Sequence, residues 1–387
     1  MQNELVYLGA PPRTGTPITS VDLDVTVDCN MRCVYCFKEK RHEQMSDRVA
    51  FDAILWLIYS SGECKNLNVA LIGGEPLLRF DLIKKLVPFA KRRAAYHGKT
   101  IHFSATTNNT LVSDEIINFW RQWGMGFHCS IDGIPEIQNK NRPLVGGLPS
   151  SDLVERGVAK ILAYRANVCA RCTIVPDNVQ YIEENYKYFR SLGFVDIAMV
   201  PGNPLEWNDT SLAALDAGFR KVGEIFKQEI RAGKKIRVKS LSETMEALAG
   251  KRSRSLVMCG AGRGMALIDV HGDIWPCHRW NKVSHGSWRI GSIYDNFSEE
   301  ARRKLDVRSQ IVKLTRNCQN CSSQFLCSGG CPAENLESSG DVFTPAENSC
   351  RIIRILTAIG QDIHRELYQE QNEEFLKMFY PPSEEAK

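Results

Sequence analysis

Short apolar runs alternate with longer amphipathic stretches between about residue 21 and residue 232. The short runs predict strands near 21–27, 67–72, 100–106, 126–131, 168–175 and 194–200. The longer stretches predict helices near 46–61, 79–97, 111–123, 152–165, 178–192 and 210–231. Strands that alternate with helices are typical of βα units and a parallel sheet. We therefore expect an α/β fold in which six βα units form a partial, TIM-like (β/α)6 barrel.

The regions outside this alternating segment have other patterns. Residues 232–255 are rich in Lys, Arg and Ser and predict a connector, and residues 265–275 alternate like a hairpin with Gly272 near its turn. Residues 352–368 predict a further helix. We expect three parts, which are an irregular N-terminal arm at 1–20, a barrel core at 21–235 and a cysteine-rich domain at 236–387.

The composition, with 43% hydrophobic and 24% charged residues in a chain of 387, is that of an ordinary globular protein of two or three domains. The formal net charge of +4 is small for this length and the basic clusters are dispersed, so nucleic acid is not an expected partner. No apolar run reaches the roughly 18 residues of a membrane span, and the N-terminus lacks the pattern of a secretory signal. We therefore expect a cytoplasmic protein with no membrane partner.

The fourteen cysteines are unevenly distributed. Three fall between residues 29 and 36, and seven fall between residues 259 and 350. Clustered cysteines in a cytoplasmic protein indicate metal binding or catalysis, because disulfides are disfavoured there. The sequence therefore predicts at least two metal regions. The four remaining cysteines are expected to be small buried hydrophobic residues, and they are Cys64, Cys129, Cys169 and Cys172.

The first cysteine group has the spacing C-x3-C-x2-C, at Cys29, Cys33 and Cys36, directly after the first expected strand. Three thiolates are one short of the four ligands that a four-iron, four-sulfide cluster needs, so one iron would be left for a ligand that is not protein. The alternative is a zinc site with His42 as a fourth ligand. Zinc sites are usually built on C-x2-C pairs, which this triplet fits poorly.

This triplet, with the aromatic Tyr35 before its last cysteine, resembles the signature of the radical S-adenosylmethionine (SAM) superfamily. The motif Gly73-Gly74-Glu75-Pro76, about 40 residues later and after the second expected strand, strengthens the resemblance. The resemblance implies that the open iron binds SAM and that one electron splits SAM into methionine and a 5′-deoxyadenosyl radical. It also implies a partial-barrel core and an electron donor such as flavodoxin or ferredoxin.

Several residues match positions that bind SAM in this superfamily. The resemblance implies that the Gly73–Pro76 motif holds the amino group of SAM, where two glycines let the backbone approach a ligand. It implies that Ser130 and Arg142 bind the carboxylate and that Tyr35 lies near the adenine. The alternatives are that Arg142 is a surface arginine and that Tyr35 packs against the cluster loop. Ser104 and Asn108, on and after the third expected strand, complete the expected cofactor contacts.

The seven later cysteines resemble the SPASM extension, a module that holds two auxiliary four-iron clusters. The resemblance implies one auxiliary cluster on Cys318, Cys321, Cys327 and Cys350. It implies another on Cys259, Cys277 and Cys331, with one ligand missing because Met265 stands where sulfatase-maturing relatives have a cysteine. We expect either an open iron there or a ligand from elsewhere. A zinc ribbon would need only four of the seven cysteines.

His278 follows Cys277, at a position that is aspartate in the sulfatase-maturing enzymes. It is a candidate catalytic residue, and a hydrogen bond from its ring to cluster sulfur is the alternative. The resemblance predicts an oxidoreductase with three four-iron clusters and SAM that abstracts hydrogen from a peptide, giving a cross-link or an oxidised side chain. The alternatives are formylglycine formation on sulfatases, radical chemistry on a small molecule, and a zinc-binding interaction protein that is no enzyme.

Overall fold

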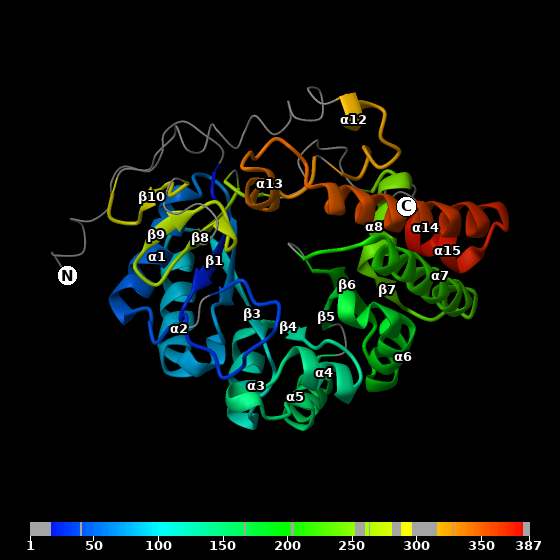
Figure 1. The fold of residues 1–387 in the computed structure, drawn as a ribbon. Coiled ribbons are helices and arrows are strands. Elements are labelled where there is room, and N and C mark those ends of the chain that lie inside the picture. The colour runs from blue at the N-terminus through cyan, green and yellow to red at the C-terminus, as the bar shows by residue number, and fades with distance from the viewer. Residues whose placement is uncertain are drawn as a thin grey trace. The chain divides into compact units, whose positions relative to one another are not determined.

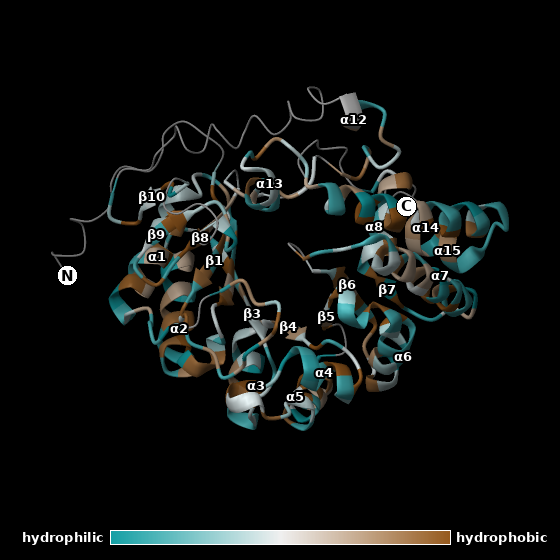
Figure 2. Cartoon of the chain, viewed as in Figure 1, coloured by the Kyte–Doolittle hydropathy of each residue, from teal (hydrophilic) through white to brown (hydrophobic). Residues whose placement is uncertain are grey.

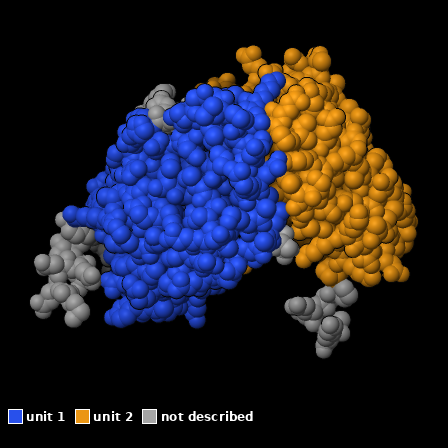
Figure 3. Space-filling view, turned by 90° about the horizontal axis from the view of Figure 1, so that it is seen from below, with its two compact units in different colours: residues 1–130, 139–164, 259–307 blue, residues 131–138, 165–258, 308–387 orange. Residues whose placement is uncertain are grey.

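The computed structural model describes residues 17–38, 41–165, 168–202, 205–251, 260–262, 264–280, 288–295, 316–327 and 329–381. The chain packs as two compact units (Figure 3). Unit 1 contains residues 1–130, 139–164 and 259–307, and unit 2 contains residues 131–138, 165–258 and 308–387. In the part of the chain that is described, no helix is both long enough and apolar enough to cross a membrane.

Unit 1 is organised around a sheet whose central strands are parallel (Figure 1). Its strands are β1 (Ser20–Asp24), β2 (Asn66–Ile72), β3 (Thr100–Thr107), β4 (Gly126–Ser130), β8 (Met265–Ile268), β9 (Asp273–Trp275) and β10 (Gly291–Ser292). They lie in the order β10-β9-β8-β1-β2-β3-β4. Strand β8 is parallel to β1, whereas β9 and β10 form antiparallel pairs. The hairpin expected from the sequence is therefore confirmed, and it extends this sheet.

Helices connect the parallel strands. They are α1 (Asp47–Ser60), α2 (Phe80–Tyr96), α3 (Asp114–Trp123), α4 (Pro135–Asn141) and α5 (Ser151–Tyr164), with short 3-10 turns at Pro76–Arg79 and Val145–Gly147. Local sequence sets their ends: Ser46 and Ser113 accept hydrogen bonds from the first turns of α1 and α3. Gly124 ends α3 with a left-handed φ of 62°.

Unit 2 contains three parallel strands, β5 (Cys169–Ile174), β6 (Asp196–Pro201) and β7 (Arg237–Val238). Its helices are α6 (Ile182–Leu192), α7 (Asp209–Arg231), α8 (Lys239–Leu248), α12 (Arg316–Gln319), α13 (Pro332–Ser339), α14 (Glu347–Gln369) and α15 (Glu373–Phe379), with a 3-10 turn at Pro176–Tyr181. Buried apolar residues join α14 to its neighbours, and hydrophilic residues line α14 and α15 (Figure 2). This pattern is that of helices with one face in the core.

The expected α/β fold with a parallel sheet is confirmed, because each of the six expected strands is present within a few residues of its predicted bounds. The expected connector at 232–255 is wrong in its first part, where β7 and α8 lie. Polar residues obscured that helix in the sequence, since its buried side is narrow and includes Ser242 and Thr244 as well as Leu241 and Met245. The domain boundaries at 20 and 235 stay predictions.

Candidate metal and cofactor centre

The first cysteine group lies in a loop that is held by backbone pairing with a distant segment of unit 1. Met31 and Leu144 form an antiparallel bridge. The Arg32 N–H donates to the Pro143 carbonyl at 2.8 Å, and the Val34 N–H donates to the Asn141 carbonyl at 2.9 Å. This pairing fixes the backbone between Cys29 and Cys36 although the loop contains no helix or strand. Cys29 is buried, and Cys33 and Cys36 are half-buried.

The same pairing brings together two residues that the sequence assigned to cofactor binding. Arg142 Nη1 donates a hydrogen bond to the Tyr35 hydroxyl at 2.6 Å. Arg142 is only 8% exposed, so the alternative of a surface arginine is wrong. Its segment is also fixed by the Ser150 hydroxyl, which donates to the Arg142 carbonyl at 2.7 Å.

Gly73 and Gly74 follow β2 and lie directly against the strand end that leads to the first cysteine. The Gly74 N–H donates to the Thr26 carbonyl at 2.7 Å. A Cβ at Gly73 would lie 2.3 Å from the Thr26 carbonyl oxygen, and one at Gly74 would lie 2.0 Å from the Asp28 carbonyl oxygen. Such distances exclude any side chain, which explains both glycines. The glycines therefore serve the packing of two loops in this structure, and their predicted approach to SAM stays a prediction.

Glu75 is buried and connects two of the loops that follow strands. Its carboxylate accepts hydrogen bonds from the Leu77 N–H at 3.1 Å, the Thr107 hydroxyl at 2.8 Å and the Asn108 N–H at 2.7 Å. Burial raises the pKa of Glu75 to about 7, and these hydrogen bonds reduce the rise only in part. Pro76, the next residue, is buried at the start of a 3-10 turn.

Asn108 connects the loop after β3 to the cysteine loop. Its Nδ2 donates to Asn30 Oδ1 at 2.8 Å and lies 3.9 Å from Cys29 Sγ, within reach of a weak hydrogen bond to sulfur. The next residue, Asn109, has a left-handed φ of 69° and donates from Nδ2 to the Ser130 carbonyl at 3.0 Å. The loops after β1, β2 and β3 and the last residue of β4 are thus joined in one hydrogen-bonded region of unit 1.

Ser104 and Ser130 are less closely involved. Ser130 is the last residue of β4 and contributes its carbonyl to the contact with Asn109. Ser104 lies inside β3, opposite Gly126 of β4, and is half-buried. The expected contact of each with SAM stays a prediction.

His278 lies just beyond β9 and faces β1 in unit 1. Its Nδ1 is 3.0 Å from Asp22 Oδ2, and its ring stacks on Phe37 with 5.7 Å between ring centroids. The His278 side chain is 42% exposed. Asp22 was not among the residues predicted from the sequence. The available signal was that β1 carries two acidic residues, Asp22 and the buried Asp24, although acidic residues are uncommon in strands.

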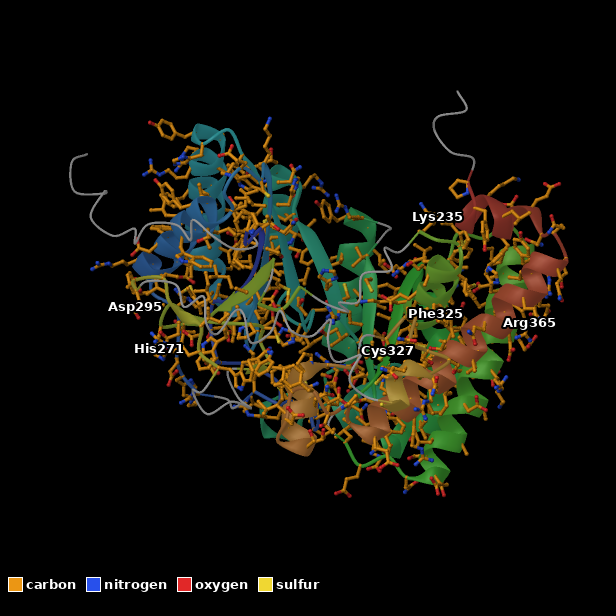
Figure 4. The ribbon with its side chains drawn as sticks, turned by 90° about the horizontal axis from the view of Figure 1, so that it is seen from above. Lys235, His271, Asp295, Phe325, Cys327 and Arg365 are labelled. Carbon is orange, nitrogen blue, oxygen red and sulfur yellow. The ribbon has the colours of Figure 1, made fainter. Side chains whose placement is uncertain are left out.

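Four of the later cysteines surround one cavity in unit 2. The cavity has a volume of about 490 Å³ and is lined by Cys318, Cys321, Cys327 and Cys350, together with Ser323 and two arginines of α14. Figure 4 shows Cys327 beside α14. These are the four residues that the sequence assigned to one auxiliary cluster.

The four thiols of this cavity differ in their electrostatic surroundings. Burial raises the pKa of Cys350 to about 11, and burial also raises the pKa of Cys327. Burial acts in the same direction on Cys321, but hydrogen bonds from the Ser323 N–H and the Arg354 guanidinium outweigh it and lower the pKa of that thiol. Arg354 belongs to no sequence motif, and the helix expected at 352–368 was assigned no functional residue.

The remaining cysteines assigned to a cluster do not share one described unit. Cys259 lies outside them. Cys277 is half-buried and lies in unit 1, whereas Cys331 precedes α13 in unit 2. A shared cluster on these residues stays a prediction.

The donor set of the cavity fits an iron–sulfur group better than a single zinc ion. A single zinc ion holds its sulfur ligands at about 2.3 Å from one centre, whereas these four thiols share the lining of a cavity of about 490 Å³ with nine other residues. Among the described residues, no three His, Cys, Asp or Glu side chains form a group that could hold one metal ion. In the first group, the half-buried Cys33 and Cys36 and the buried Cys29 are three sulfur donors, which fits a cluster with one iron left for SAM.

Comparison with known proteins agrees with these features. Residues 23–189 match the model of the radical SAM superfamily. The chain is 24% identical over 337 residues to a cysteine-type anaerobic sulfatase-maturating enzyme of Clostridium perfringens, with 81% of this chain and 89% of that protein covered. It is 22% identical over 356 residues to a serine-type anaerobic sulfatase-maturating enzyme of Klebsiella aerogenes, with coverages of 88% and 86%.

Two solved structures have a similar fold. One is native anSMEcpe with bound AdoMet and Cp18Cys peptide, with a TM-score of 0.78, 20% identity, and coverage of 92% of this chain and 100% of that one. The other is Streptococcus suis SuiB bound to the precursor peptide SuiA, with a TM-score of 0.62, 13% identity, and coverages of 86% and 76%.

Proposed function

Because this chain is a radical SAM enzyme related to the anaerobic sulfatase-maturating enzymes, we propose that it modifies a peptide after abstracting hydrogen from one of its carbon atoms. The product would be a cross-link or an oxidised side chain. One observation carries the proposal. The Asn108 N–H donates to Glu75 and its side chain donates to Asn30, so the loops after β2 and β3 are hydrogen-bonded to the cysteine loop. Both peptide complexes among the similar structures support a peptide as the substrate class.

The cofactors supply the difficult chemistry in this proposal. When bound, a four-iron cluster on Cys29, Cys33 and Cys36 together with SAM supplies a 5′-deoxyadenosyl radical and methionine. The chain positions these groups. Gly73, Gly74 and Glu75 would hold the amino group of SAM, and their tight fit against Thr26 and Asp28 makes that backbone rigid.

Arg142 and Tyr35 would bind the other end of SAM. A guanidinium suits a carboxylate because it offers several donors in one plane. Arg142 is buried and already held by the Tyr35 hydroxyl, so its geometry is set before a ligand arrives. Ser130 would add a hydroxyl donor to the carboxylate, and Ser104 and Asn108 would complete the pocket wall.

His278 is the catalytic side chain of the proposal. Asp22 orients its ring through Nδ1, which leaves Nε2 as the atom that could contact a substrate. Phe37 fixes the plane of the ring by stacking. Asp22 is then a positioning residue, because it acts through His278.

We propose two auxiliary clusters in addition, one in the cavity of unit 2 and one on Cys259, Cys277 and Cys331. With the SAM-binding cluster they make three four-iron clusters. A flavodoxin or ferredoxin would deliver the electrons. The domain boundaries at 20 and 235 belong to the same proposal.

The test is an anaerobic assay of the reconstituted full-length enzyme with SAM, a chemical reductant and short peptides encoded beside the gene. We expect 5′-deoxyadenosine, methionine and a peptide that is two hydrogen atoms lighter by mass spectrometry. Deuterium at the reacting carbon should appear in the 5′-deoxyadenosine. Reduced, reconstituted enzyme that leaves SAM intact would contradict the proposal.

Formylglycine formation is the second candidate, and the similarity to sulfatase-maturating enzymes favours it. The same assay with sulfatase peptides that contain cysteine or serine separates the two. An aldehyde that reacts with a hydrazine probe would support formylglycine formation. Turnover of the neighbouring peptide without an aldehyde would support the first candidate.

A further inference from the structure

The cysteine cavity of unit 2 contains two arginines with different partners. Arg351 and Arg354 both line the cavity and both belong to α14, the helix that carries Cys350. Arg354 follows Cys350 by four positions, so the two share a face of the helix. Either arginine is therefore close enough to the thiols to affect their charge.

Arg351 is engaged elsewhere. Its Nη2 lies 2.5 Å from Asp209 Oδ1, at the start of α7 in the same unit. Arg351 therefore already has a carboxylate partner. Arg351 is a natural control for any effect of Arg354, because it has the same charge and the same cavity.

Arg354 is directed at the thiols. Its guanidinium forms a hydrogen bond with the Cys321 side chain, and it interacts electrostatically with Cys350 and Cys318 as well. The residue is exposed, so it lies at the cavity mouth and its replacement leaves no buried hole. The structure thus places one permanent positive charge, with a planar set of donors, against one particular cysteine sulfur.

We propose that Arg354 donates a hydrogen bond to Cys321 Sγ and thereby raises the reduction potential of the iron–sulfur cluster in this cavity. This inference rests on the proposed function, since it requires the second auxiliary cluster. One-electron reduction makes a cluster more negative, and a cationic donor on a ligand sulfur stabilises the reduced form more than the oxidised form. Hydrogen bonds to cluster sulfur are among the features that set such potentials.

The size of the effect follows from the exposure of Arg354. Solvent and salt weaken a charge at a cavity mouth, so we expect less than the effect of a buried ion. We expect the ratio of oxidised to reduced cluster, at a fixed potential, to rise roughly threefold to tenfold when the hydrogen bond is lost. A tenfold change equals about 59 mV for a one-electron couple.

The test is a redox titration of the reconstituted full-length protein, followed by electron paramagnetic resonance. Cys29, Cys33 and Cys36 are replaced by alanine to remove the signal of the first cluster. A Cys318→Ala variant identifies the couple that belongs to the cavity. Arg354→Met, Arg354→Lys and Arg351→Met are then compared at equal iron content.

The proposal requires that Arg354→Met shifts this couple to a more negative potential, that Arg354→Lys gives a smaller shift and that Arg351→Met leaves it nearly unchanged. A potential that does not move in Arg354→Met, or that moves equally in Arg351→Met, would overturn it. If iron analysis and the Cys318→Ala comparison find no cluster in the cavity, the auxiliary-cluster part of the proposed function fails instead. The two failures are therefore distinguishable.

Discussion

The two cysteine groups of this chain are held by different physical means. In unit 1, Cys29, Cys33 and Cys36 fall within eight residues, and backbone pairing with residues 141–145 fixes their loop. In unit 2, the cysteines span residues 318–350, and α12, the segment that follows it and α14 place them around a cavity. Near the first group, guanidinium groups bond to the Tyr35 hydroxyl and to the Cys29 carbonyl, whereas at the second group the Arg354 guanidinium bonds to the Cys321 side chain.

This difference matches different tasks. The first group offers three sulfur donors in a loop whose backbone is fixed, beside the buried Glu75 and Asn108. A cavity with four thiols leaves no iron of a four-iron cluster without a protein ligand. Within the proposed function, the first group is the one assigned to SAM chemistry and the second the one assigned to electron storage or transfer.

Removing each group in turn gives the largest expected effect. Replacement of Cys29, Cys33 and Cys36 by alanine should reduce SAM cleavage to background and remove about four irons per chain. The Cys318→Ala variant should lose a similar amount of iron but keep SAM cleavage without substrate. Iron analysis and measurement of 5′-deoxyadenosine check both variants. SAM cleavage by the triple variant would contradict the assignment of SAM chemistry to the first group.

A side chain at Gly74 should damage the first group alone. Its Cβ would meet the Asp28 carbonyl oxygen at 2.0 Å, so one of the two loops must move. We expect Gly74→Ala to lower the free energy of unfolding by about 3 kcal/mol and to weaken SAM binding, while the cluster signal of the cavity is unchanged. The control is Gly126→Ala, whose Cβ would have an ordinary contact of 3.4 Å with Ser104.

The buried Glu75 should make the stability of the first region depend on pH. Its pKa is about 7 in the folded protein against 4.5 as the ordinary value, so the folded state binds the proton more tightly. The stability from this group is complete below pH 4.5 and is lost as pH rises through 7, by up to about 3 kcal/mol. Denaturant unfolding of the metal-free protein at several pH values measures this slope.

The matched variant is Glu75→Gln, which cannot ionise. Its stability should be flat over the same interval, apart from the contribution of other groups. If the free energies of unfolding of wild type and variant change in parallel with pH, then burial does not raise the pKa of Glu75. That result would contradict the role of Glu75 as a buried link between the loops after β2 and β3.

The smallest effect is expected at His278, which belongs to unit 1 but not to its cysteine loop. His278→Ala should reduce peptide turnover about a hundredfold, at the lower end of the range of a positioned acid–base group, and should leave SAM cleavage and iron content intact. Asp22→Asn should have a weaker effect of the same kind. Equal losses of SAM cleavage and peptide turnover would show that His278 supports the cofactor site rather than the substrate.

Much of this molecule could be predicted from sequence where signals are local. Three such signals each lie within a short stretch: the apolar runs of the strands, the C-x3-C-x2-C loop and the Gly73–Pro76 motif. The structure confirms the fold that they indicate. The partners that come from far along the chain could not be predicted. Arg142 reaches Tyr35 across 107 positions, and His278 reaches Asp22 across 256.

The second region was predicted in part for the same reason. Its cysteines are recognisable because cysteine is rare, and the four assigned to one cluster line one cavity, while their role as cluster ligands stays a prediction. Arg354 is one of many arginines, and only the turn of α14 that carries Cys350 shows that it faces sulfur. The helix α8 was missed because its buried side includes Ser242 and Thr244.

The most direct test of the account is the electron paramagnetic resonance spectrum of the reduced, reconstituted enzyme before and after SAM is added. The account predicts that SAM changes the signal of one cluster, and that this change disappears when Cys29, Cys33 and Cys36 are replaced by alanine. A spectrum that SAM leaves unaltered, or zinc bound to these three thiols in place of iron, would contradict it.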